Sequence, residues 1–164
     1  MVNNPGKNKY LLDSNILIGF SLWKPMSLQL NNSFWIQFSE SLGRGDWILL
    51  DVVVNEVNNG YDSELKKWCK QQTTNNYIQK ISSDNRNRGI DINNAYPMID
   101  QHSQKSTVDT YLVAYAEENN LGIFSRETPR RNSNDLYKIP DVCDILKIKR
   151  LRKPKAFLKE IGFN

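Results

Sequence analysis

Four acidic residues have the types and the spacing to do chemistry together: Asp13, Glu56, Asp109 and Glu127. Carboxylates that converge on one place repel one another. Hard divalent cations such as Mg²⁺ or Mn²⁺ relieve that repulsion because they prefer oxygen ligands. A site with one or two such ions can activate water and neutralise phosphate charge, which is the chemistry of phosphodiester hydrolysis. Each acid alone also has an ordinary explanation, as a turn, cap, surface or loop residue, so the prediction depends on their joint placement.

The stretch that positions Asp13 is the most informative in the chain. Residues 10–12 are apolar and predict a short buried strand, and the Asp-Ser-Asn triplet at 13–15 predicts the turn or helix cap that follows. A short helix is expected over 16–22, ending before Pro25. An acid at the carboxyl end of a buried parallel strand lies where open α/β sheets bind their ligands. Asp13 is therefore the first candidate for chemistry.

The remaining elements alternate between short strands and helices. Further strands are expected at 47–50, 121–125 and 136–139, and helices at 34–42, 51–59, 62–70, 108–118 and 140–146. Glu56 lies on one of these helices and Asp109 in the first turn of another. Residues 71–94 are polar, with a weak helical pattern around 77–81 only. The alternation predicts an α/β protein with a parallel sheet and helices on both faces, forming a single domain over residues 1–164.

Composition and charge restrict the class of protein and its partners. The chain has 164 residues, of which 39% are hydrophobic and 24% charged, as is typical of a globular protein. No stretch has the roughly 18 apolar residues of a membrane span. The first nine residues lack the apolar core of a signal peptide, and the two cysteines suit a reducing compartment, so we expect a cytoplasmic protein.

Basic residues gather toward the C-terminus. Residues 126–164 hold eleven Lys or Arg against five Asp or Glu, a net charge of +6, while the first 125 residues carry −2. The densest part lies in the basic C-terminal segment 147–164. Such asymmetry favours a polyanionic partner, nucleic acid first, or else a solvated basic surface that binds nothing.

The acids and their neighbours resemble the PIN-domain ribonuclease family, which includes the toxin half of many bacterial toxin–antitoxin pairs. Residues 11–18 (LLDSNILI) resemble the family's first strand and acid, and residues 53–57 (VVNEV) its glutamate helix. Residues 108–116 (VDTYLVAYA) are similar to its third acidic motif, and Ser125-Arg126-Glu127 to its fourth. Residues 138–143 (KIPDVC) resemble the closing strand and turn of a little-characterised PIN-like branch. The resemblance covers nearly the whole chain.

The resemblance implies a three-layer α/β/α sandwich with a short parallel central sheet. It also implies a Mg²⁺- or Mn²⁺-dependent endoribonuclease, with RNA as substrate and with a cognate antitoxin protein and a homodimer as partners. Because no stretch is long and apolar enough to span a bilayer, we expect no membrane partner. The alternative is a catalytically silent PIN-like module that binds nucleic acid or protein without cutting. A doubly wound nucleotide binder is a third reading, but the glycine fingerprint is missing after the first strand.

The resemblance also assigns roles to individual residues. Asp13, Glu56 and Asp109 would hold metal, and Asn15 and Ser125 would orient the acids. Because the family's fourth acid is most often aspartate, the longer Glu127 acts either as a direct ligand or through water. Asp141 is a reserve candidate, with helix capping as its simpler explanation. The arginines that flank Glu127 would contact substrate phosphates: Arg126, Arg130 and Arg131.

Two other features have weaker implications. His102, the single histidine, lies in a polar stretch without a nucleophilic serine motif around it, which favours a surface role. Three of the four tryptophans fall in apolar periodic segments and are expected in the core. Trp23, beside Lys24, is the exception and is a candidate for stacking on a base.

Overall fold

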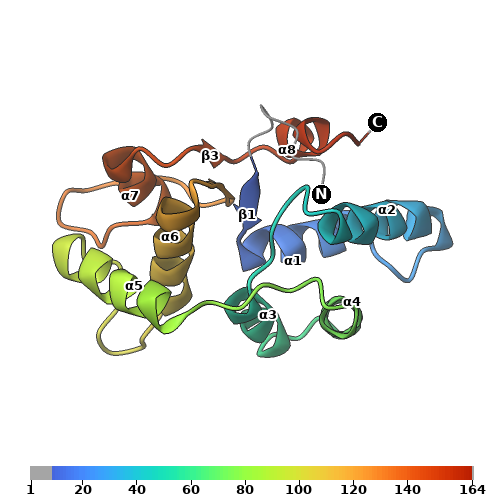
Figure 1. The fold of residues 1–164 in the computed structure, drawn as a ribbon, viewed down its shortest axis with the longest axis horizontal. Coiled ribbons are helices and arrows are strands. Elements are labelled where there is room, and N and C mark those ends of the chain that lie inside the picture. Colours follow the sequence, from blue (N-terminus) through green and yellow to red (C-terminus); the bar gives the residue numbers. More distant parts are fainter. Residues whose placement is uncertain (1–8, 164) are drawn as a thin grey trace.

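A short parallel sheet runs through the middle of the molecule (Figure 1). The structure is a computed structural model that describes residues 9–163. The N-terminal residues on which the expectation about export depends lie mostly outside that range. The three strands are β1 (Tyr10–Leu12), β2 (Gly122–Phe124) and β3 (Arg150–Leu151), in the order β1-β2-β3 and parallel throughout.

Two single parallel bridges extend the sheet beyond β1. Leu11 pairs with Ile48, and Leu50 pairs with Gln79. The expected strand at 47–50 is thus an extended segment held by isolated bridges rather than a full strand. It carries the chain from the sheet directly into the helix with Glu56.

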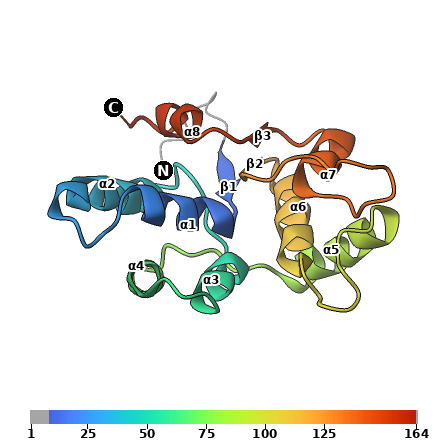
Figure 2. The ribbon, with the colours of Figure 1, turned by 180° about the vertical axis from the view of Figure 1, so that it is seen from behind.

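The helices form two groups on opposite sides of the strands (Figures 1 and 2). In one group α1 packs on α3 and α4, and in the other α6 packs on both α5 and α7. The expected α/β class with a parallel sheet is confirmed, and the arrangement is compatible with a three-layer α/β/α sandwich. In chain order the helices are α1 (Ser14–Trp23), the 3-10 helix η1 (Gln29–Asn31), α2 (Asn32–Gly43), α3 (Asp51–Asn58), α4 (Ser63–Thr74), α5 (Ser83–Ala95), α6 (Thr107–Asn119), α7 (Ile139–Leu146) and α8 (Pro154–Glu160).

Local sequence explains where several helices begin and end. α1 starts one residue after Asp13 and stops at Trp23, because Pro25 cannot continue it. Asp62 caps α4 by accepting a hydrogen bond from the Leu65 amide at 3.0 Å. Both predicted helices are confirmed, but α1 is longer than expected at both ends, and α4 continues to Thr74 instead of ending at residue 70.

Two predictions about secondary structure are wrong. The polar stretch 71–94 holds the end of α4 and most of α5, while the residues around Gln79 are extended instead of helical. The expected strand at 136–139 is absent from the described residues: the Tyr137 amide donates to the Pro97 carbonyl at 2.8 Å, and Ile139 already belongs to α7. The third strand lies instead within the basic C-terminal segment.

Aromatic packing joins the sheet to the helices that cover it. The ring of Phe124 in β2 stacks on Phe157 of α8 with centroids 4.5 Å apart, and Phe38 of α2 stacks on Trp47 at 4.4 Å. The three tryptophans expected in the core, at 35, 47 and 68, are buried, whereas Trp23 is half exposed. Between residues 9 and 163, none of the helices combines the length and apolar character needed to cross a membrane.

Candidate active site

The carboxyl ends of β1 and β2 bring the first and fourth acidic motifs together. The Asp13 amide donates to the carbonyl of Phe124 at 3.1 Å, so Asp13 and Ser125 leave the sheet side by side. Asp13 is only 4% exposed, and Asp109, in the first turn of α6, is 9% exposed. Two of the three predicted metal ligands therefore lie buried at the edge where α/β sheets bind ligands.

Ser125 is the centre of the hydrogen bonds that orient Asp13. Its hydroxyl donates to Asp13 Oδ2 at 2.8 Å and accepts from the Asn15 amide nitrogen at 3.4 Å and from the Glu127 backbone amide at 3.2 Å. The Arg126 amide in turn donates to Asn15 Oδ1 at 3.2 Å. Asn15 and Ser125 thus both contact the surroundings of Asp13, and these bonds hold the first turn of α1 to the loop after β2.

Asp13 and Asp109 are difficult to ionise in this surrounding. Burial raises the pKa of Asp13, and hydrogen bonds from Ser125 and Ser14 offset part of that rise. Burial, followed by repulsion from Asp13, Glu127 and Glu56, raises the pKa of Asp109 well above its ordinary value. Because the charge of Asp13 also raises the pKa of Glu56 and of Glu127, the four carboxylates share one electrostatic site.

Glu56 and Glu127 complete this site from two other segments. Burial raises the pKa of Glu56, the Ser14 hydroxyl lowers it, and Asp13 and Glu127 raise it further. Glu56 Oε1 is buried and has no hydrogen-bond partner among the described residues. Burial also raises the pKa of Glu127, and the Ile139 amide at 3.1 Å from its Oε2 lowers it. One oxygen of Glu127 is therefore occupied by the start of α7.

The chemistry of these groups suits a hard divalent cation. Every donor is a carboxylate oxygen, one buried oxygen lacks a partner, and repulsion from the other three acids raises the pKa of Asp109. Within residues 9–163, however, no three acidic, histidine or cysteine side chains are grouped tightly enough to hold an ion as they stand. The residues fit the ion by their chemistry, but they do not form a closed cage.

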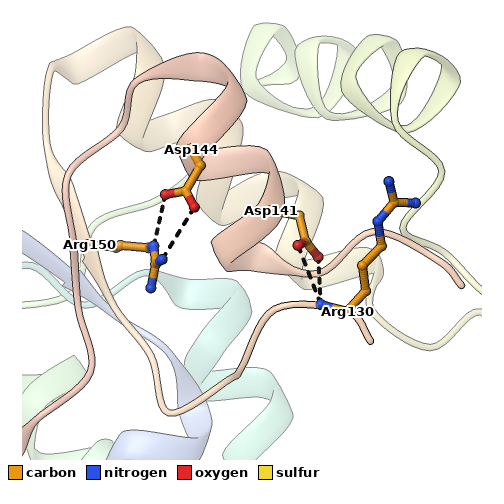
Figure 3. Close-up of polar contacts among 4 residues, drawn as sticks. All are labelled: Arg130, Asp141, Asp144 and Arg150. Atoms are coloured by element: carbon orange, nitrogen blue, oxygen red, sulfur yellow. Dashed lines mark hydrogen bonds and ion pairs between the residues drawn. The ribbon is translucent and has the colours of Figure 1, made fainter. Parts of the chain in front are cut away.

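Asp141 holds the loop between β2 and α7 through hydrogen bonds to its backbone. Its carboxylate accepts from the backbone amide of Arg130 at 3.1 Å (Figure 3) and from that of Lys138 at 2.8 Å. Figure 3 also shows the Arg130 side chain directed away from this carboxylate. Both contacts are those of a residue that caps a helix and closes a loop, which supports the simpler explanation of Asp141.

The three arginines differ in their surroundings. The Arg130 guanidinium donates to the Ser133 carbonyl at 3.0 Å and lies 3.7 Å from the Tyr137 ring centroid, so it is engaged in folding its own loop. Arg131 is exposed in the same loop. Arg126 is exposed and directly follows Ser125, with its guanidinium against Gly19 of α1. Arg126 is the best placed of the three to meet a substrate bound at the acids.

Two groups at the site, the Ser14 hydroxyl and the Ile139 backbone amide, were not predicted from the sequence. Ser14 lies next to both Asp13 and Glu56 and lowers the pKa of each. Its signal was present, because it directly follows the first acid. The Ile139 amide left no signal, since a backbone donor can be placed only once the fold is known. His102 is exposed, as expected of a surface residue.

Residues 10–163 match the protein family described as Domain of unknown function (DUF4411). The match begins at β1 and includes every element described above. No curated protein matches the chain.

Proposed function

The chain belongs to the DUF4411 family, and we propose that it is a Mg²⁺- or Mn²⁺-dependent endoribonuclease with a PIN-like three-layer fold. One observation carries the proposal. Four carboxylates from four separate segments lie beside the carboxyl edge of a parallel sheet, and repulsion from Asp13 raises the pKa of the other three. A cation that binds among these buried carboxylates removes their repulsion, and this relief favours binding of the cation.

In this proposal Asp13, Glu56 and Asp109 hold the cation. When bound, the cation supplies activation of water and neutralisation of charge on the scissile phosphate. Ser125 orients Asp13 through its 2.8 Å hydrogen bond, and Ser14 orients Glu56 and Asp13. Glu127, with one oxygen bound by the Ile139 amide, presents the other oxygen to water or to the ion.

RNA is the proposed substrate because an arginine lies beside the acids and basic residues gather in the C-terminal part of the chain. Arg126 borders the site, and the C-terminal residues add a net positive charge that favours a polyanion. The resemblance to PIN toxins extends the proposal to a cognate antitoxin protein and a homodimer as partners, and to action in the cytoplasm. Inhibition of bacterial growth on expression, relieved by the product of a neighbouring gene, would support the toxin role.

Cleavage of a 5′-labelled mixed RNA pool tests the proposal. We expect the purified chain to cut RNA with Mg²⁺ or Mn²⁺ and not with EDTA, and Asp13→Asn to abolish cutting. Asp84→Asn is the matched control, because Asp84 is an exposed first-turn acid of α5, outside the site. Unchanged cutting by Asp13→Asn would refute the site assignment.

A silent PIN-like binding module is the second candidate function. The observation that favours it is the lack of a tightly grouped set of three ligands within residues 9–163. RNA binding that is indifferent to Mg²⁺, together with no cutting by a folded chain under any metal condition, would favour this module over the nuclease.

A further inference from the structure

A pocket of about 260 Å³ opens beside the acidic site. Four of its lining residues come from α1, the helix that begins after Asp13, and a fifth is Arg126, which directly follows Ser125. The last is Pro154, at the start of α8. Figures 1 and 2 both show α8 on the same side of the strands as α1. The lining residues are Ile16, Gly19, Phe20, Trp23, Arg126 and Pro154.

Trp23 gives the pocket an aromatic surface that is both exposed and held in place. Its side chain is 50% exposed, yet its ring lies 6.1 Å from the ring of the buried Phe20, with 27° between the planes. The ammonium of Lys24 lies 4.8 Å from the same ring. An exposed indole therefore combines with positive charge at one place, which is the pattern that binds an unpaired base and its phosphate.

Further positive charge borders the pocket on two sides. A Cβ atom at Gly19 would lie 2.9 Å from Arg126 Nη1, so the missing side chain of Gly19 lets the guanidinium rest on α1. Arg152, Lys153 and Lys155 flank Pro154, and all three are exposed. A pocket with apolar and aromatic lining and basic residues beside it complements single-stranded nucleic acid, whose bases stack on aromatic rings while its phosphates pair with cations.

The pocket lies within reach of a strand bound at the acids. With a helical rise of about 1.5 Å per residue, Gly19 is about 9 Å and Trp23 about 15 Å along α1 from Asp13. We propose that the pocket binds an unpaired base of the RNA, a few nucleotides from the phosphate at the acids. This inference rests on the proposed function, because it takes the same RNA as substrate.

Fluorescence anisotropy with a short labelled single-stranded RNA tests the pocket without using cleavage. The full chain is titrated in EDTA, and we expect Trp23→Ala to weaken binding by about tenfold, with Trp23→Phe restoring most of it. Leu22→Ala is the control, because Leu22 is 74% exposed on the same helix and does not line the pocket. Equal binding by wild type and Trp23→Ala would overturn the proposal and assign the pocket to another class of ligand, such as a peptide. An equal loss in Leu22→Ala would also overturn it.

Gly19→Ala provides a second variant for which loss of folding is no concern. Alanine favours a helix over glycine, and the atom that its Cβ would meet is the end of the flexible Arg126 side chain. We expect this variant to fold at least as well as wild type, to displace the guanidinium and to bind the RNA more weakly. Unchanged RNA binding by Gly19→Ala would contradict the role of Arg126 in the pocket.

An RNA with one abasic position identifies the base that the pocket takes. At that position the abasic RNA should bind wild type and Trp23→Ala equally, because the base that Trp23 contacts is already gone. If no position in the RNA behaves in this way, the pocket does not take a base. If RNA binding depends on Trp23 but the chain cuts no RNA, the proposed nuclease activity is refuted and the proposed base-binding pocket is supported. Cutting with binding indifferent to Trp23 would refute the pocket alone.

Discussion

Replacing Asp109 by asparagine should make the metal-free protein more stable at neutral pH. Burial and three neighbouring carboxylates raise the pKa of Asp109, so ionising it at pH 7.5 opposes folding. Each unit of pKa elevation is worth about 1.4 kcal/mol. A stability change of 1 kcal/mol shifts the melting temperature by about 2–4 °C in a domain of this length. We therefore expect Asp109→Asn to melt higher than wild type in EDTA, by about 3–6 °C for each unit by which the pKa is raised.

Asp84→Asn is the matched control for this experiment. Asp84 is also a first-turn acid, on α5, but it is exposed. An acid in the first turn favours its helix by about 0.3–1 kcal/mol, so Asp84→Asn should melt slightly lower than wild type. Thermal unfolding followed by circular dichroism measures all three chains. A lower melting temperature for Asp109→Asn, like that of Asp84→Asn, would mean that Asp109 acts as an ordinary helix acid. It would refute the claim that ionising Asp109 opposes folding.

Three further predictions concern pH, orientation and the loop. The acids at the site have raised pKa values in the folded chain, so their contribution to stability is complete below pH of about 4 and is lost as pH rises through the folded pKa. In thermal melts from pH 5 to 8, the stability of the metal-free chain should therefore fall. Mn²⁺ should raise the melting temperature most at pH 8. Ser125→Ala removes the hydroxyl that orients Asp13, and it should slow RNA cleavage by about 10- to 100-fold with little change in RNA affinity; an unchanged rate would refute the orienting role. Asp141→Ala leaves the amides of Arg130 and Lys138 without their acceptor and should destabilise the chain by about 1–2 kcal/mol, with proteolysis moving to the loop before α7; wild-type stability and cleavage pattern would argue against this role of Asp141.

The elements that hold Asp13 and Asp109 were predictable because their signals are local. An apolar run followed by an acid is enough to identify β1 and the start of α1. The apolar spacing in α6 places Asp109 in its first turn. Since β1 and β2 are parallel, α6, which leads into β2, runs back against them, and its first turn with Asp109 comes to the carboxyl edge where Asp13 lies.

α5 escaped prediction because tertiary contacts hold it more than an apolar face does. Few of its side chains are buried, and Gly89 lets it approach Tyr111 of α6 closely: a Cβ at Gly89 would lie 2.9 Å from that ring. The Arg88 guanidinium pairs with Glu117 of α6 at 2.6 Å. A polar helix that binds its neighbour through charges and a glycine has little hydrophobic periodicity to detect.

β3 escaped prediction for a related reason. It has two residues, one of them Arg150, which pairs with Asp144 at 2.9 Å (Figure 3). Its apolar content is too low to distinguish it from a solvated basic segment. Residues 136–139, by contrast, have the composition of a strand but pair with no neighbouring strand among the described residues. Strand pairing depends on distant neighbours, and composition alone does not report them.

Binding of Mn²⁺ to the RNA-free chain is the most direct test of the central claim that these acids form one cation site. Electron paramagnetic resonance of free Mn²⁺ at pH 7.5 measures how much the protein binds. We expect wild type and Asp84→Asn to bind Mn²⁺, and Asp13→Asn to lose that binding. Equal binding by Asp13→Asn and wild type, or no binding by wild type at millimolar Mn²⁺, would contradict the central claim.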